Sequence, residues 1–165
     1  MLTPVQIRSV INGHTQMREH SCFQSAVEMV LKLYNVISLD SYPEQAIVEN
    51  DGKGFQPFQT TKQYGSTLVS FEETKYEPIS QAALDKCVEL LNGGIFPVLS
   101  LSWPDGRGFH GFIAFLSDKD SLSFITKEQI GKAHTRIYEQ ADIWPFQAKT
   151  EILGVRIVAC AAKTI

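Results

Sequence analysis

A glutamine and a cysteine lie six positions apart where a polar stretch gives way to a periodic apolar one. Cys22 begins the periodic segment, in which apolar residues recur at helical spacing. The unpaired N–H groups and the macrodipole of a helix N-terminus lower the pKa of a thiol, and the thiolate is the nucleophile. The same N–H groups, with the side-chain amide of Gln16, can stabilise an oxyanion on a carbonyl group under attack. The pair therefore indicates nucleophilic catalysis, with Cys22 as the nucleophile and Gln16 as the oxyanion donor.

The base for such a thiol has to be a histidine from elsewhere in the chain, which contains four. His14 and His20 precede the helix and His134 lies in a charged segment, so these three are interpreted as exposed polar residues. His110 differs, because it begins the apolar segment FHGFIAFLS directly after a Gly-rich turn. An imidazole there is expected to be partly buried and to need a hydrogen-bond partner. Gly111 beside it leaves room for another chain or a substrate, so His110 is the predicted base.

The cysteines also have a structural interpretation, since a cysteine in an amphipathic helix more often packs in a core than catalyses. Cys87 falls on the apolar stripe of a second predicted helix and is expected to pack there. The chain has three cysteines, an odd number at wide spacing, and Cys160 is far from the other two. This pattern argues against a disulfide framework and against a zinc site. We predict no metal and no cofactor.

Two helices are predicted to position these residues. The first has Ser21 as its N-cap and ends near Tyr34–Asn35, with Glu28 and Lys32 on a face other than the apolar one. The second spans residues 80–94 and stops at a pair of glycines.

The second half of the chain predicts a sheet. Apolar, β-branched runs separated by turn residues indicate strands at residues 95–103, 109–117, 122–126 and 152–160. Residues 134–147 predict a strand followed by a short helix or turn, and the Gly-rich residues 50–66 predict a long surface loop that could contact substrate. Helix first and sheet second indicates an α+β fold, and the length favours a single domain over residues 1–165.

With these elements in order, the pattern Q-x5-C at the start of a helix and GFHGFIAF on a strand resemble the papain-like cysteine peptidases. The shorter bacterial forms are similar in layout over about residues 14–130: leader peptidases that cut after a double glycine, and papain-like type III effector proteases. The resemblance implies a papain-like fold, with a central helix packed on an antiparallel sheet. It gives Gln16 the oxyanion role, Cys22 the nucleophilic role and His110 the role of base. It also implies a peptide or protein substrate.

The chain departs from this family at the residue that orients the imidazole. The family usually has Asp or Asn about sixteen residues after the histidine, and that position is Thr126 here. Glu128 shares the face of Thr126 by two-residue alternation and could serve instead. Three possibilities follow: Thr126 orients His110, Glu128 orients it, or Cys22 and His110 work as a dyad.

Composition excludes some function classes. The formal net charge is −3 and no cluster of basic residues stands out, which argues against nucleic-acid binding. No apolar run reaches the roughly 18–20 residues of a membrane span. No classical signal peptide is visible, so a cytoplasmic location is the default expectation, although signal-independent secretion as an effector would leave the same sequence. The oligomeric state is not predicted.

The leading hypothesis is a cysteine hydrolase or acyl transferase that acts on a peptide or amide bond. Cys22 would form an acyl-thioester, which water or an acceptor amine would resolve. The alternative is a non-catalytic papain-like binding module for a peptide or protein partner. The missing Asp or Asn favours the alternative, and the retained Gln16 favours the enzyme. An unrelated α+β domain is the third possibility.

Overall fold

The computed structural model describes residues 2–17, 21–51, 61–76, 80–102, 109–116, 121–127, 135–139 and 154–165. Four helices and seven strands occur in this part of the chain. In chain order they are α1 (Pro4–Asn12), α2 (Cys22–Leu33), α3 (Pro43–Asp51), β1 (Thr61–Tyr64), β2 (Thr67–Tyr76), α4 (Gln81–Asn92), β3 (Phe96–Ser102), β4 (Phe109–Leu116), β5 (Leu122–Lys127), β6 (Thr135–Glu139) and β7 (Gly154–Thr164).

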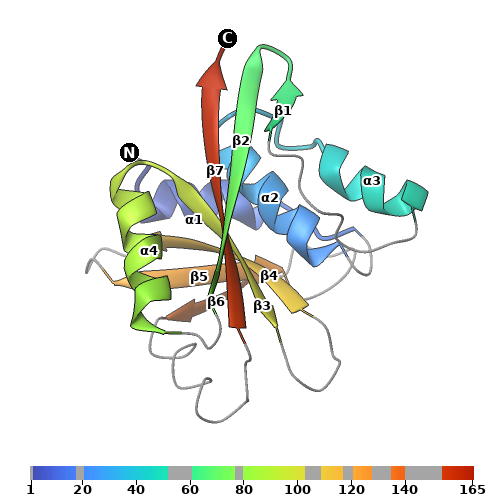
Figure 1. The fold of residues 1–165 in the computed structure, drawn as a ribbon. Coiled ribbons are helices and arrows are strands. Elements are labelled where there is room, and N and C mark those ends of the chain that lie inside the picture. Colours follow the sequence, from blue (N-terminus) through green and yellow to red (C-terminus); the bar gives the residue numbers. More distant parts are fainter. Residues whose placement is uncertain are drawn as a thin grey trace.

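The seven strands form one sheet in the order β1-β2-β7-β3-β4-β5-β6. Every neighbouring pair is antiparallel. The last strand in sequence, β7, lies between β2 and β3, where Cys160 is paired with Phe71 on one side and Phe96 on the other. The outer ends of β2 and β7 extend side by side beyond the rest of the molecule (Figure 1). Helices beside an antiparallel sheet confirm the predicted α+β class.

The two faces of the sheet carry different helices. Successive residues of a strand point to opposite faces. At Gly111 of β4, an added Cβ would lie 2.6 Å from the carbonyl oxygen of Cys22, so this residue faces α2. The next residue, Phe112, instead lines a small apolar cavity with Leu84 and Cys87 of α4. Helices α2 and α4 therefore lie on opposite faces of β4.

Helix α2 is buried on almost all sides, including the face that carries Glu28 and Lys32. Glu28 and Lys32 are 0% and 3% exposed. The physical reason is that α2 contacts β3, β4 and β5 on one side and α1 and α3 on the other. Its charged residues therefore meet the protein instead of solvent, and they need internal partners.

The predicted C-terminal ends of α2 and α4 are confirmed. Asn35 follows α2 with φ = 58°, and Gly94 follows α4 with φ = 77°, both in the left-handed conformation common after a helix C-terminus. Ser21 and Ser80 occupy the N-cap positions, but neither side chain caps its helix. The hydroxyl group of Ser21 instead donates a hydrogen bond to Gln45 on α3.

The predicted strands correspond to β3, β4, β5 and β7, and β7 continues to Thr164. The strand expected in residues 134–147 is β6; residues 140–147 lie outside the described part of the chain. The loop predicted for residues 50–66 is wrong at its start, where residues 50 and 51 belong to α3, and residues 52–60 lie outside the described part of the chain. It is also wrong toward its end, because residues 61–64 form β1. This four-residue edge strand is largely polar, so its sequence carries no apolar alternation. Helices α1 and α3 and strand β2 were not predicted.

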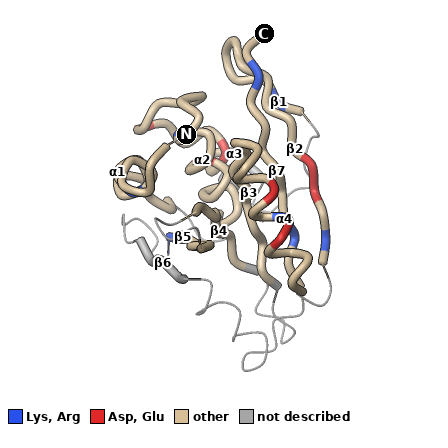
Figure 2. The backbone as a smooth tube through the Cα atoms, turned by 90° about the vertical axis from the view of Figure 1, so that its left-hand side faces the viewer, with Lys and Arg blue, Asp and Glu red and all other residues tan. Residues whose placement is uncertain are grey.

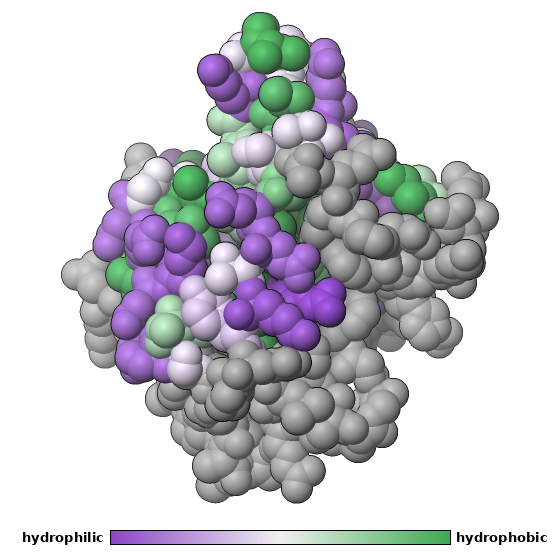
Figure 3. Space-filling view, in the orientation of Figure 1, coloured by the Kyte–Doolittle hydropathy of each residue, from purple (hydrophilic) through white to green (hydrophobic). Residues whose placement is uncertain are grey.

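Charged residues lie along strand β2. Acidic and basic residues follow one another along β2 (Figure 2), and Glu73 of β2 pairs with Arg156 of β7 at 3.4 Å. The face that carries α4 is largely hydrophilic over this helix (Figure 3). Among the helices of the described residues, none combines the length and apolar character needed to cross a membrane.

Candidate active site

Cys22, the first residue of α2, packs against the strand that carries His110. A Cβ at position 111 would lie 2.6 Å from Cys22 O and 2.9 Å from Phe23 Cα, distances that real Cβ atoms do not adopt, so only glycine fits. The backbone N–H of Gly111 donates a hydrogen bond to the thiol, and so does that of Phe23. The space left by Gly111 is thus filled by α2 of the same chain. Gly111, which donates to the thiol, directly follows His110 in the chain.

Hydrogen bonds at Thr126 determine the tautomer of His110. Thr126 is 1% exposed, and its Oγ1 lies 2.7 Å from His110 Nε2. The same hydroxyl group donates to the carbonyl oxygen of Gly111, also at 2.7 Å. Because a hydroxyl group has one proton, Thr126 accepts from His110, and Nε2 carries the hydrogen. The lone pair of the neutral imidazole is therefore on Nδ1.

A second contact restrains the same ring. His110 meets Phe112 edge-on, with ring centroids 5.1 Å apart and planes at 83°. Aromatic pairs favour this geometry. Glu128, the other candidate for orienting the imidazole, lies outside the described residues, as do His20 and His134. Of the two candidates, Thr126 is the one that the structure describes beside His110.

The electrostatics of Cys22 differ from the expectation for a helix N-terminus. Burial raises the pKa of the Cys22 thiol, and the backbone N–H groups of Gly111, Phe23 and Cys22 act in the opposite direction. The expected net lowering is wrong because the loss of hydration exceeds the stabilisation by backbone N–H groups. Cys22 is nonetheless partly exposed, whereas Cys87 and Cys160 are buried. Burial raises the pKa of Cys87 to about 12.

Gln16 is 8% exposed and lies on the segment between α1 and α2. The side-chain amide of Gln45 bonds the backbone of the residues immediately before and after Gln16. Met17 N donates to Gln45 Oε1 at 2.6 Å, and Gln45 Nε2 donates to Thr15 O at 3.0 Å. The same Oε1 also accepts from Ser21 Oγ at 3.0 Å, immediately before Cys22. One buried amide thus holds the segment that carries Gln16 and leads to Cys22.

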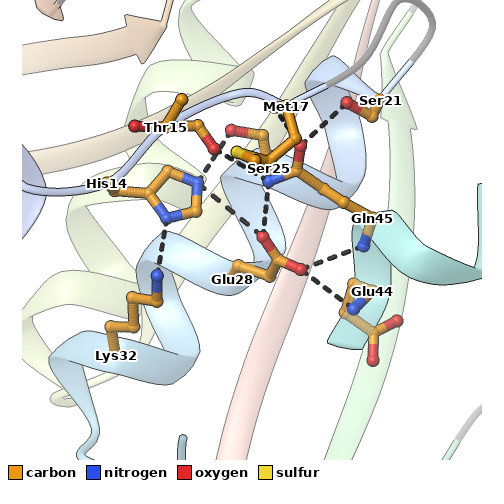
Figure 4. A network of polar contacts seen from close by, with 9 residues as sticks. All are labelled: His14, Thr15, Met17, Ser21, Ser25, Glu28, Lys32, Glu44 and Gln45. Atoms are coloured by element: carbon orange, nitrogen blue, oxygen red, sulfur yellow. Dashed lines mark hydrogen bonds and ion pairs between the residues drawn. The ribbon is translucent and has the colours of Figure 1, made fainter. Parts of the chain in front are cut away.

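Behind this segment lies a buried polar network (Figure 4). Glu28 Oε1 accepts from the backbone N–H groups of Glu44 and Gln45, each at 2.9 Å. Glu28 Oε2 accepts from Gln45 Nε2 at 2.6 Å and lies 3.8 Å from His14 Nε2. The first amides of α3 therefore hold a carboxylate, as expected for a helix N-terminus. Burial raises the pKa of Glu28 to about 7.

His14 is a member of this network, which corrects the expectation that it is exposed. The side chain is 1% exposed. Its Nδ1 lies 3.0 Å from Lys32 Nζ and its Nε2 lies 2.9 Å from Ser25 Oγ. An ammonium group can only donate, so Nδ1 accepts and Nε2 carries the hydrogen. Burial, then Lys32, lowers the pKa of His14 to about 3.

Sequence reasoning missed Gln45 and the internal role of Glu28. A weak signal was available in Pro43, which suits the first turn of a helix. No signal in the chain indicated that this helix returns to a segment about thirty residues upstream. Among the described residues, no group of His, Cys, Asp or Glu side chains could hold a metal ion. No protein-family model matches the chain, and no curated protein matches it.

Proposed function

We propose that the protein is a papain-like cysteine hydrolase or acyl transferase that acts on peptide or amide bonds. One observation carries this proposal. Thr126 holds His110 as the Nε2–H tautomer, and the next residue, Gly111, donates a backbone hydrogen bond to the Cys22 thiol. A thiol, an oriented imidazole and a helix N-terminus are the components of thiol-dependent acyl transfer.

In the proposed reaction, the thiol proton passes to His110 Nδ1 as Cys22 Sγ attacks the substrate carbonyl carbon. The oxyanion is bound by the Gln16 amide and the backbone N–H of Cys22. His110 returns the proton to the leaving amine, which leaves an acyl-thioester on Cys22. Water or an acceptor amine then attacks the thioester and restores the thiol.

The electrostatics favour a neutral resting pair. Burial raises the pKa of Cys22, and the Thr126 hydroxyl orients an imidazole without the charge that would stabilise an imidazolium ion. Proton transfer is therefore expected to accompany the attack, and alkylation of Cys22 should accelerate continuously from pH 6 to pH 9.

The test is alkylation with iodoacetamide at neutral pH, with modification of each cysteine followed by mass spectrometry. Cys22 should react at least about 10-fold faster than Cys87 and Cys160, which serve as internal controls. His110→Ala should slow the reaction at Cys22 alone. Equal rates at the three thiols, or no effect of His110→Ala, would refute the proposal.

The alternative, a papain-like module that binds a peptide without cleaving it, is favoured by the raised pKa of Cys22. Incubation with a peptide mixture separates the two functions. An enzyme produces cleaved or transferred products with the wild type and none with Cys22→Ser. A binding module retains the same peptides with both proteins and changes none of them.

A further inference from the structure

Gln45 has a side-chain amide whose hydrogen-bonding capacity is fully used inside the protein. The residue is 1% exposed. Its oxygen accepts from Met17 N and Ser21 Oγ, at 2.6 and 3.0 Å. Its nitrogen donates to Thr15 O and Glu28 Oε2, at 3.0 and 2.6 Å. A primary amide has two donors and two acceptor lone pairs, so every position is filled.

The partners also determine the orientation of this amide. A backbone N–H can only donate, so the atom that faces Met17 is the oxygen of Gln45. The carbonyl of Thr15 can only accept, so the atom that faces it is the nitrogen. The two backbone groups belong to the residues on either side of Gln16, and they lie outside any helix or strand. Gln45 therefore supplies bonds that regular secondary structure does not provide there.

Helix α3, which carries Gln45, is itself attached at two places. Glu28 of α2 accepts from the backbone N–H groups of Glu44 and Gln45. The Glu44 carboxylate accepts from Tyr64 and Lys62 of β1, each at 2.6 Å. The first attachment is buried. Through Gln45, it connects α2, which begins with Cys22, to the segment that contains Gln16.

We propose that Gln45 is a positioning residue for the candidate active site: it holds Thr15–Met17 so that the Gln16 amide can bind the oxyanion. This inference rests on the proposed function. Gln45 acts through Gln16 and does not contact the reacting atoms. Its loss should therefore affect the transition state more than substrate binding, since small displacements of a positioned group are costly.

The test variant is Gln45→Met, which keeps the size of the side chain and removes its four hydrogen bonds. The matched control is Glu44→Ala, which detaches α3 from β1 and leaves the amide of Gln45 in place. We expect kcat on a cleaved peptide to fall about 10-fold for Gln45→Met with KM within about 2-fold. Inhibition by a peptide aldehyde, whose adduct carries an oxyanion, should weaken in parallel. Glu44→Ala should change none of these quantities by more than about 2-fold.

A double-mutant cycle distinguishes positioning from general destabilisation. In the Gln16→Ala background, Gln45→Met should cause no further loss of kcat, because the donor that it positions is gone. An equal 10-fold loss in both backgrounds overturns the inference. Alkylation of Cys22 should stay within about 2-fold of the wild type, since Gly111 and α2 surround the thiol without Gln45.

Backbone amide exchange in the wild type tests the bond from Met17 N–H to Gln45 without any variant. Met17 N–H should be protected from exchange by its bond to Gln45, although it lies outside a helix or strand. Exchange at the rate of an unprotected amide overturns the inference even if Gln45→Met fails to fold. Absence of both turnover and selective Cys22 alkylation in the wild type refutes the proposed function. An active wild type with an unimpaired Gln45→Met variant refutes the positioning role alone.

Discussion

Two histidines in this protein are bonded to hydroxyl groups in the same way but have different surroundings on the other side of the ring. His110 Nε2 is bonded to Thr126 and His14 Nε2 to Ser25, so each neutral ring has its lone pair on Nδ1. In His14 that lone pair accepts from the Lys32 ammonium group, and the ring is 1% exposed. His110 is only partly buried, and it directly precedes Gly111, whose backbone N–H donates to the Cys22 thiol.

The difference shows that a hydroxyl partner fixes the tautomer, while the second partner decides what the ring can do. Burial and, second, the Lys32 ammonium group lower the pKa of His14 to about 3, so the ring is neutral at moderate pH. A thiol has a proton to give, so under the proposed function His110 would act as a base toward Cys22. Substitutions at the two positions test whether His110 is catalytic and His14 structural.

The largest expected effect is on turnover in His110→Ala. Removal of the base should lower kcat on the order of 10³-fold, within the range for general acid–base catalysis, with little change in melting temperature. His14→Ala is the matched substitution and should show the reverse: a clear loss of stability, since Lys32 is left buried without its acceptor, and a smaller loss of turnover. Turnover assays and thermal melts of both variants make the comparison. A similar fall in turnover for both variants would mean that the two histidines do not differ in this way.

Gln16→Ala should have the next largest effect. Loss of one oxyanion donor costs on the order of 10²-fold in kcat, and the free energy of unfolding should change little. Gln63→Ala, on the edge strand β1, is the control for loss of a glutamine side chain. Steady-state kinetics would expose an incorrect assignment if kcat in Gln16→Ala equalled that of the control.

The third prediction concerns pH and the network around His14. Burial raises the pKa of Glu28 to about 7, so its contribution to the free energy of unfolding is complete below pH 4.5 and lost as the pH rises through 7. The pKa of His14 is lowered to about 3, so its contribution is complete above pH 6.5 and lost as the pH falls toward 3. The two effects oppose each other between pH 4.5 and 6.5.

Glu28→Gln removes the first contribution and leaves the second. Relative to the wild type, the variant should lose on the order of 2 kcal/mol of stability between pH 7 and pH 4.5. Urea unfolding at a series of pH values measures this difference. Glu89→Gln, the same substitution on the exposed surface of α4, should follow the wild type. Parallel curves for Glu28→Gln and the wild type would mean that Glu28 does not titrate in this range.

The smallest expected effect comes from the hydroxyl group beside His110. Thr126→Val keeps the shape of the side chain and removes the acceptor for Nε2–H, so kcat and the alkylation rate of Cys22 should fall about 10-fold. Thr126→Asn offers an oxygen to His110 and an N–H to Gly111 O, and it should retain more activity than Thr126→Val. Equal rates for both variants would indicate that another group holds the ring.

Much of the local structure could be predicted because it depends on residues close in sequence. Apolar periodicity marked α2 and α4, left-handed residues marked their ends, and β-branched runs marked most strands of the second half. Polar β1 and short α3 lack such strong patterns and were missed. Helix α1 was also missed, although Thr3 and Gln6 form a capping box at its start and Pro4 occupies its first turn. The candidate residues Gln16, Cys22, His110 and Thr126 could also be chosen from their chemistry and order along the chain.

Only the tertiary structure decided how these residues are surrounded. The sequence by itself determined that Cys22 begins a helix and that His110 and Thr126 lie on successive strands. It did not determine that β4 packs on the helix through Gly111, or that Glu28, Lys32 and His14 are enclosed. Nor did it determine that Gln45 returns to the segment around Gln16. Burial and hydrogen-bond partners depend on contacts between segments far apart in the chain, and such contacts leave no periodic pattern in the sequence.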